Sequence, residues 1–374
     1  MTAIAPAPYV LICAGEDSGD VLGAPFVQAL ALQGRRVCGT GGTRMQAAGL
    51  EPLADFEELP VSGFGDVLPR YFRLHRIYDC LAAALQKPEC IGLIAVDYPG
   101  FNMKLCALAK RLQKPVLYVA PPQVWAWKKR RAKQLRDTDL AVLFEFERAA
   151  YQKFGCTAQL LRHPFLQSSS EELLQSASHD FLLLPGSRKS QALRNMDLYL
   201  PVVRGLLDSE MRGSVVKVVA ARASLVDVLK QKIAACFGGF VPMWISVVLA
   251  PSSAEKRRAM YASACSALTA PGTATLELAL SGCPQVVATV PDTLTYVMGK
   301  LLICTPVFAM PNILLGSCIP EYIVPSWACR SKMQEIKMAL VESSKKTAIE
   351  IANKLIDALQ AGNEAADLVK PFIV

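Results

Sequence analysis

The chain has few histidines and no closely spaced pair of cysteines. It contains only three histidines, and its twelve cysteines are scattered without a C-x-x-C pair. Zinc sites need clusters of these residues at short spacing, so we predict no metal site. We expect the cysteines to be reduced and mostly buried, as small apolar residues of a cytosolic protein.

The common nucleotide fingerprints are also missing. No G-x-G-x-x-G or Walker phosphate loop occurs, and the nearest approach, residues 39–44, has Arg44 in the place of the last glycine. This disfavours both NAD and ATP, and we predict no cofactor.

Charged residues make up only 19% of the 374, whereas 52% are hydrophobic, which predicts large cores and two domains of ordinary size. The formal net charge of +8 suits phosphate-bearing ligands, nucleic acid or anionic lipid without choosing among them. Leu301–Pro320 has no charged residue, but Pro306, Pro311 and Pro320 interrupt it, so we expect no transmembrane helix. The N-terminus does not resemble a signal peptide.

Short apolar runs alternate with helical patterns along the chain, which predicts α/β domains with parallel sheets covered on both faces. A segment rich in Ser, Glu and Gln, Gln167–His179, separates two such series, and Ser331–Leu368 has a helical pattern. We expect a first domain of residues 1–168, completed by a helical tail of about 343–374, and a second domain of 169–342. The predicted strands are Tyr9–Cys13, Val37–Gly39, Ile91–Val96, Val116–Val119, Leu140–Phe144, Phe181–Leu184, Val215–Val219, Ile245–Leu249, Ala267–Ala270 and Gln285–Ala288.

Two predicted strands of the second series each lead into a Pro-Gly turn and a helix start. One continues as Pro185-Gly186-Ser187-Arg188 and the other as Pro271-Gly272-Thr273. Such turns direct backbone N–H groups to one edge of a sheet, and an arginine binds two phosphate oxygens at once, so they predict a nucleotide-diphosphate site. A surface ion pair is the alternative role of Arg188.

Two polar residues further along the second series have two interpretations each. Glu277 follows the second Pro-Gly turn, where its carboxylate can accept both hydroxyls of a ribose or pair with a basic residue. Asn312 lies in a Pro-Asn turn signal and either reaches the expected cleft or stabilises its own loop.

In the first series, Asp97 directly follows a buried apolar run, at a strand end where ligands of open parallel sheets bind. A carboxylate there can take a proton from a sugar hydroxyl, or serve in a turn. Asn102 is a candidate cap of the next helix. Residues 15–20 follow the first strand, and there Glu16, Ser18 and Asp20 are candidates for binding sugar hydroxyls, the alternative being an ordinary polar turn.

A basic and apolar stretch contains Leu68, Arg70, Tyr71, Phe72 and Arg73. It suits an anionic membrane surface, with an ordinary core-facing helix as the alternative. Trp125 and Trp127 precede the basic run of 128–133. Aromatic residues beside basic ones are typical of sites that bind single-stranded nucleic acid. No nucleic-acid module surrounds this run, and we predict no nucleic-acid partner.

Seven motifs taken together, in this order, resemble the lipid-A-disaccharide synthase family from about Leu11 to Tyr322. They are Gly15-Glu16-Asp17-Ser18-Gly19-Asp20, Gly41-Gly42-Thr43-Arg44-Met45, Asp97-Tyr98-Pro99-Gly100-Phe101-Asn102, Pro121-Pro122-Gln123-Val124-Trp125-Ala126-Trp127, Leu184-Pro185-Gly186-Ser187-Arg188, Gly272-Thr273-Ala274-Thr275-Leu276-Glu277 and Pro311-Asn312.

The resemblance implies a GT-B glycosyltransferase, in which two Rossmann-like domains face each other across a cleft. It implies transfer of 2,3-diacylglucosamine from UDP to 2,3-diacylglucosamine 1-phosphate with inversion, at the inner face of the bacterial cytoplasmic membrane and without a bound metal.

The same resemblance implies roles for single residues. Asp97 matches the base and Arg188 the residue that neutralises the leaving diphosphate. Glu277 and Asn312 match the nucleotide side, and Glu16 and Ser18 match the loop opposite. The basic and apolar stretch matches a lipid-facing surface.

The chain departs from the family pattern at Gly100, Arg162, Gln191 and Pro271, and none of these removes a proposed catalytic group. Gln191 and Pro271 affect the expected detail of the UDP pocket. The alternatives are another UDP-hexosamine transferase or epimerase of the same architecture, and a non-enzymatic binder of membranes or nucleic acid. The sequence does not indicate an oligomeric state.

Overall fold

The computed structural model describes residues 7–59, 67–124, 130–166, 180–208, 214–293, 296 and 307–373, with only the backbone at 57 and 67–71. By its internal contacts the chain divides into two compact units. One comprises Met1–Pro164 with Leu359–Val374, and the other comprises Phe165–Ala358.

The first unit is built on a parallel sheet whose described strands follow the order β3-β2-β1-β4-β5-β6-β7. The central pair, β1 and β4, is buried along almost its whole length, as its nearly unbroken apolar sequence predicts. The strands are β1 (Tyr9–Ala14), β2 (Arg36–Thr40), β3 (Leu50–Pro52), β4 (Cys90–Val96), β5 (Val116–Val119), β6 (Asp139–Val142) and β7 (Ala158–Leu160).

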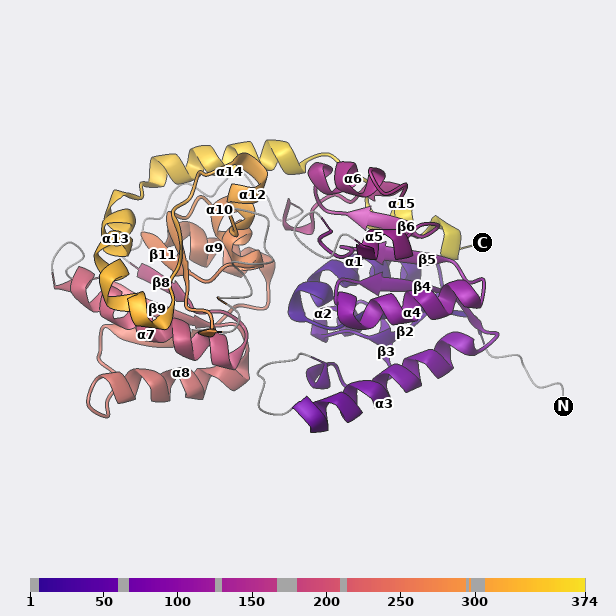
Figure 1. Cartoon of the computed structure of the whole chain (residues 1–374), viewed down its shortest axis with the longest axis horizontal. Helices are drawn as coiled ribbons and strands as arrows, with labels where there is room; N and C mark the ends of the chain where they lie inside the picture. Colours follow the sequence, from indigo (N-terminus) through magenta and orange to yellow (C-terminus); the bar gives the residue numbers. More distant parts are fainter. Residues whose placement is uncertain are drawn as a thin grey trace. The chain divides into compact units, whose positions relative to one another are not determined.

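Helices cover both faces of this sheet (Figure 1). α3, α4, α5 and α6 pack on one face, and α1, α2 and α15 pack on the other. Their bounds are α1 (Asp17–Leu32), α2 (Thr43–Ala47), α3 (Val67–Gln86), α4 (Pro99–Arg111), α5 (Arg130–Gln134), α6 (Glu145–Gln152) and α15 (Ala365–Leu368).

The second unit repeats the architecture with the described strand order β10-β9-β8-β11-β12-β13, all parallel. Its strands are β8 (Asp180–Leu184), β9 (Val215–Ala220), β10 (Ile245–Leu249), β11 (Ser266–Thr269), β12 (Gln285–Thr289) and β13 (Glu321–Ile323). α7 (Lys189–Leu207), α8 (Ala223–Cys236) and α13 (Cys329–Glu342) cover one face, whereas α9 (Ala254–Ser263) and α10 (Thr273–Leu280) cover the other.

All ten predicted strands are confirmed with small shifts of their ends, and three short edge strands, β3, β7 and β13, were not predicted. The helical tail is broken at Ser343 and Ser344 into α13 and α14 (Lys345–Leu359). α14 packs on the second unit, where the Lys345 ammonium group donates to the carbonyl oxygen of Ala262. By its internal contacts, the C-terminal segment that belongs to the first unit, here called the returning tail, begins at Leu359, whereas we expected it to begin at about residue 343.

The returning tail attaches to the open edge of the first sheet. The Asn363 N–H donates to the Leu160 carbonyl oxygen at 2.7 Å, and the Asn363 carbonyl oxygen accepts from the Arg162 N–H at 2.9 Å. The Arg162 guanidinium also pairs with Glu364 at 2.8 Å. The departure from the family pattern at Arg162 is thus accommodated by a contact with the tail.

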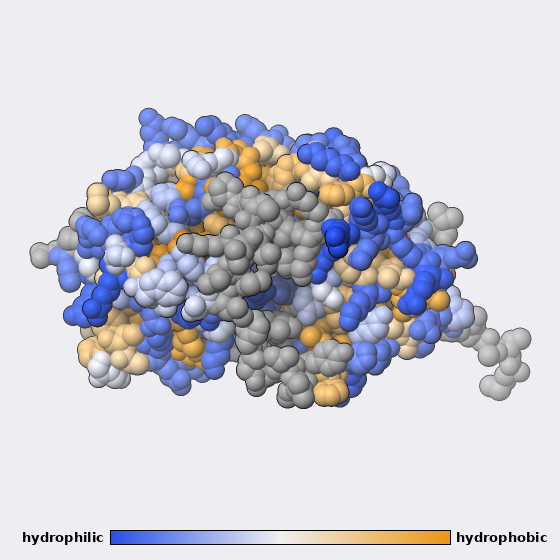
Figure 2. Space-filling view, viewed as in Figure 1, coloured by the Kyte–Doolittle hydropathy of each residue, from blue (hydrophilic) through white to orange (hydrophobic). Residues whose placement is uncertain are grey.

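None of the described helices has the length and apolar composition needed to cross a membrane. On the face shown in Figure 2, apolar residues form separate patches among hydrophilic ones. In the segment considered as a possible span, residues 301–306 lie outside the described part, and Met310–Leu315 form the short helix α12. The described cysteines are free. Six of them are buried and three are partly buried, whereas Cys80 and Cys236 are exposed.

Candidate functional site

The two Pro-Gly turns of the second unit lie side by side. They follow β8 and β11, which are neighbouring parallel strands. Phe181 pairs with Ser266 at one end, and Leu184 pairs with Thr269 at the other. Beyond the strands, the Ala270 N–H donates to the Leu184 carbonyl oxygen at 2.9 Å. A Cβ atom built on Gly186 would lie 3.6 Å from that of Ala270. The structure therefore brings together the two turns that the sequence singled out.

Each turn leads directly into a helix N-terminus. α7 begins after Arg188 and α10 begins after Gly272, and neither first turn receives a side-chain cap. Gly186 and Gly272 have φ angles of 110° and 149°, a conformation that favours glycine. The N–H groups of two first helical turns and the positive ends of two helix dipoles thus converge at one sheet edge, an arrangement that suits an anion.

The side chains at these turns are accessible. Ser187, Arg188 and Thr273 are exposed, and Gly186 is half-buried. The Oε1 atom of Gln191, one of the departures from the family pattern, lies beneath the turn, 3.1 Å from a Cβ built on Gly186. A side chain at 186 would require Gln191 to shift by a few tenths of an ångström, and the positive φ angle of Gly186 already favours glycine there.

A buried asparagine that the sequence analysis missed fixes this edge. The Nδ2 group of Asn195 donates to the Pro185 carbonyl oxygen at 2.8 Å. Its Oδ1 atom accepts from the Val290 N–H at 2.7 Å and from the Thr289 hydroxyl at 3.3 Å. Asn195 has no exposed surface, and it ties the turn after β8 to the end of β12.

Glu277 pairs with a basic residue, one of its two expected roles. Its Oε1 atom accepts from Nη2 of Arg257 at 2.8 Å and its Oε2 atom accepts from Nε at 3.3 Å. Arg257 also donates to the carbonyl oxygens of Pro251 and Ser252. The Arg257 and Glu277 side chains are only 9% and 18% exposed, so this ion pair holds the Glu277 carboxylate in place in the helix that follows the second turn.

The Asn312 amide forms its hydrogen bonds within its own loop, which is the second of its two expected roles. Its Oδ1 atom accepts from the N–H groups of Cys318 and Ile319, at 2.9 and 2.8 Å. Its Nδ2 group donates to the Ile319 carbonyl oxygen and to Glu321, each at 2.7 Å. Asn312 is 2% exposed and stabilises the loop.

The loop that Asn312 organises is connected to the second Pro-Gly turn through Thr275. The Thr275 hydroxyl donates to the Gly272 carbonyl oxygen at 2.8 Å and accepts from the Met310 N–H at 3.2 Å. The backbone of α12 and the Thr275 hydroxyl therefore connect Asn312 to this turn.

In the first unit, Asp97 stands at the carboxyl end of β4. Asp97 and Tyr98 both have left-handed backbone, with φ angles of 47° and 49°. The Asp97 carbonyl oxygen accepts from the Tyr118 hydroxyl at 3.0 Å and from Nδ2 of Asn102 at 2.8 Å. Non-glycine residues rarely adopt this conformation, and it persists where surrounding contacts fix it. These bonds hold the half-buried Asp97 at the strand end.

Asn102 is not a helix cap, contrary to our expectation. Tyr98 occupies the N-cap position of α4, and Asn102 lies inside the helix with no exposed surface. Its Nδ2 group faces the carbonyl oxygens of Cys13, Val96 and Asp97 at 2.8–3.1 Å. It thus joins the ends of β1 and β4, as Asn195 joins strand ends in the second unit.

The loop after β1 contacts the Asp97 turn. A Cβ atom on Gly15 would lie 2.4 Å from the Tyr98 ring, so only glycine fits there. Glu16 and Ser18, at the start of α1, are half-buried. The Asp20 carboxylate is 3% exposed and accepts from the N–H groups of Arg44 and Met45, so in this structure it caps α2.

The basic and apolar stretch forms the start of α3. The side chains of Leu68, Arg70 and Tyr71 lie outside the described part of the structure. Phe72 is 66% exposed, and Arg73 is exposed within 3.9 Å of Glu58, whereas the next turn buries Ile77. The helix therefore packs on the core from Leu74 onward and presents Phe72 to solvent.

Within the described residues no group of His, Cys, Asp and Glu side chains has the arrangement of a metal site.

The fold is that of GT-B glycosyltransferases. The calicheamicin glycosyltransferase CalG4 matches with a TM-score of 0.56 at 14% identity, over 98% of each chain. The Staphylococcus aureus MnaA–UDP structure matches with a TM-score of 0.55 at 12% identity, over 93% of this chain and 96% of that one.

The family model described as lipid-A-disaccharide synthetase matches residues 10–369, and the chain belongs to this family of glycosyltransferases. The lipid-A-disaccharide synthase of Geobacter metallireducens is 34% identical, with 85% of this chain and 84% of that protein covered. The synthase of Idiomarina loihiensis is 28% identical over 98% of both chains.

Proposed function

We propose that the protein forms lipid A disaccharide 1-phosphate. It transfers 2,3-diacylglucosamine from UDP to the 6-hydroxyl group of 2,3-diacylglucosamine 1-phosphate, with inversion and release of UDP. The observation that carries this proposal is the family match over residues 10–369. The two glycine turns of the second unit and the Asp97 turn of the first unit supply the groups that this reaction requires.

The UDP diphosphate binds at the paired turns of the second unit. Gly186, Ser187, Gly272 and Thr273 offer backbone N–H groups where two helices begin, and Arg188 adds a permanent positive charge. The negative charge on the diphosphate increases as the bond to the sugar breaks. Donors already in position therefore stabilise the transition state more than the bound substrate.

Glu277 accepts the ribose hydroxyls. A carboxylate has about four lone-pair sites, and Arg257 occupies two of them, so the remaining ones are available to a ligand. The Arg257 pair fixes the orientation of the Glu277 carboxylate in α10.

Asp97 acts as the general base. Inversion requires the acceptor oxygen to attack C1 from the side opposite the departing UDP. Asp97 takes the proton of the 6-hydroxyl as the new O–C1 bond forms, and the electrons of the broken C1–O bond leave with the diphosphate. Glu16 and Ser18, in the loop that packs beside the Asp97 turn, bind sugar hydroxyls.

The start of α3 docks on the anionic inner face of the cytoplasmic membrane, which holds both lipid substrates. Exposed Phe72 supplies apolar area and Arg73 supplies charge, and Leu68, Arg70 and Tyr71 extend the same segment. Phe72→Ser should reduce sedimentation with vesicles of phosphatidylglycerol and phosphatidylethanolamine. Met338→Ser is the matched control, since Met338 is 52% exposed on α13 of the other unit. Equal sedimentation of the two variants would contradict this docking surface.

The activity itself is tested by incubating the protein in detergent with UDP-diacylglucosamine and the monosaccharide 1-phosphate. UDP and a β-1,6-linked disaccharide should appear together, and only when both substrates are present. No product from folded protein would contradict the synthase, whereas UDP release or a change of sugar configuration without the acceptor would indicate an epimerase.

A further inference from the structure

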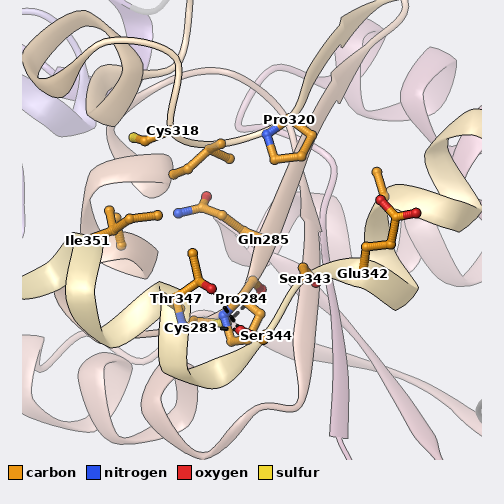
Figure 3. A pocket seen from close by; sticks show the side chains of 14 residues that line it. Cys283, Pro284, Gln285, Cys318, Pro320, Glu342, Ser343, Ser344, Thr347 and Ile351 are labelled. Carbon is orange, nitrogen blue, oxygen red and sulfur yellow. Dashed lines mark hydrogen bonds between the residues drawn. The ribbon is translucent and has the colours of Figure 1, made fainter.

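The second unit contains a cavity of about 260 Å³ at the amino ends of β12 and β13 (Figure 3). The end of α13 and the first turns of α14 form one side of it. Most of its wall is apolar, with contributions from Ala279, Ile319, Ala339, Ala348 and Ile351. Parallel strands place this edge opposite the Pro-Gly turns, which lie at the carboxyl ends, so the cavity is separate from the proposed UDP site.

Among the described residues, one residue that lines the cavity has a buried oxygen atom with no hydrogen-bond partner. Gln285, the first residue of β12, is 4% exposed, and its Nε2 group donates to the Thr275 carbonyl oxygen at 2.9 Å. A carbonyl can only accept, so the amide nitrogen must face Thr275. The Oε1 atom is buried and receives no hydrogen bond from the part of the chain that the structure describes. Figure 3 shows the Gln285 amide extending between Ile351 and Cys318.

Such an oxygen is costly unless something donates to it. Of the described residues that line the cavity, none is Lys or Arg, which disfavours an anion. The one carboxylate, Glu342, is exposed at the rim, so a cation held deep inside would lose its hydration without a buried counter-charge. The charge distribution therefore favours an uncharged ligand.

We propose that this cavity is a binding site for a small uncharged molecule, largely apolar, whose single N–H or O–H group donates to Oε1 of Gln285. A dry apolar cavity of roughly 150 Å³ accepts benzene, so the larger space here admits a two-ring compound. A water molecule can also donate to this oxygen atom, and a comparison of two probe ligands distinguishes water from the proposed ligand.

Indole and benzofuran form a matched pair of probes, because they share a shape but only indole has an N–H donor. Ligand-observed NMR on the full chain should show indole binding, and binding of benzofuran should be about tenfold weaker, the effect of losing one hydrogen bond to a buried acceptor. Equal binding of the two, or binding of neither, would overturn the proposal, and the second result would indicate water alone.

The location is tested by Ala348→Leu, which fills the cavity from a 7%-exposed position on α14. The variant should abolish indole binding, whereas Lys346→Leu, on the exposed side of the same helix, should leave it unchanged. Indole binding unaffected by Ala348→Leu would place the probe elsewhere. Competition by UDP against indole in the wild type would also contradict a separate site. If Ala348→Leu does not fold, the comparison of indole with benzofuran and the competition with UDP still test the proposal.

Discussion

Asn195 and Pro185 are joined by a hydrogen bond of 2.8 Å from the side-chain amide to the carbonyl oxygen of the turn. Because the same amide accepts from the Val290 N–H, one buried side chain connects the ends of two strands that are not neighbours in the sheet. Asn195 therefore fixes the backbone of the turn that precedes Arg188.

Replacing this asparagine should therefore weaken both the fold and ligand binding. Asn195→Ala leaves buried backbone groups at Pro185 and Val290 unpaired, which costs about 1–3 kcal/mol each. We expect a lower urea midpoint and a higher Kd for UDP by calorimetry. Asp197→Ala, at an exposed site on the same helix, should change stability by no more than about 0.5 kcal/mol. An unaltered Kd in Asn195→Ala would show that the turn does not depend on this contact.

Asp97→Asn should lower kcat by about a hundredfold or more, because loss of a general base has an effect of this size. The affinity for UDP should change little, since the Asp97 turn belongs to the other unit. Asp139→Asn provides a control at an exposed strand start. A normal rate in Asp97→Asn would remove Asp97 from the mechanism.

Arg188→Ala should raise the Kd for UDP about 10- to 100-fold, the range for losing a hydrogen-bonded charge. The turnover rate should fall as well, and the affinity for uridine, which lacks phosphates, should stay the same. Arg330→Ala, exposed on α13, is the matched control. A loss of uridine affinity equal to that of UDP would mean that Arg188 does not act on the diphosphate.

His163 should make stability sensitive to acid. Burial lowers its pKa from 6.5 to about 4, because the charged form loses hydration beside the Phe144 ring. The unfolded chain binds the proton at higher pH than the folded one, so stability falls as the pH drops from 6.5 towards 4. The total loss is about 3 kcal/mol. His163→Gln should flatten this part of the urea-unfolding profile, and an unchanged slope would contradict the assignment.

The central strands were predictable because parallel strands buried on both faces require unbroken apolar runs, such as Ile91–Val96. The edge strand β13 has the sequence Glu321-Tyr322-Ile323, and three residues with a charge among them give no such signal. The Pro-Gly turns were predictable because glycine and proline mark local backbone geometry.

The two buried asparagines were harder to predict, because their partners are distant in sequence and meet only in the folded sheet. A signal was nevertheless present, since each is a polar residue on the apolar side of a helix. Asn102 shares that side with Leu105 and Cys106, and Asn195 shares it with Ala192 and Met196. For Asn312 and Asp20 the residue type suggested ligand contacts, whereas the N–H groups they bind come from the nearby backbone and could not be assigned before the loops were placed.

The most direct test of the account is a titration of the isotopically labelled protein with UDP, followed by the amide NMR signals of Gly186 and Gly272. Both signals should shift together along one saturation curve, and uridine should move them far less. Saturable UDP binding that leaves both glycine amides in place would contradict the proposed diphosphate site.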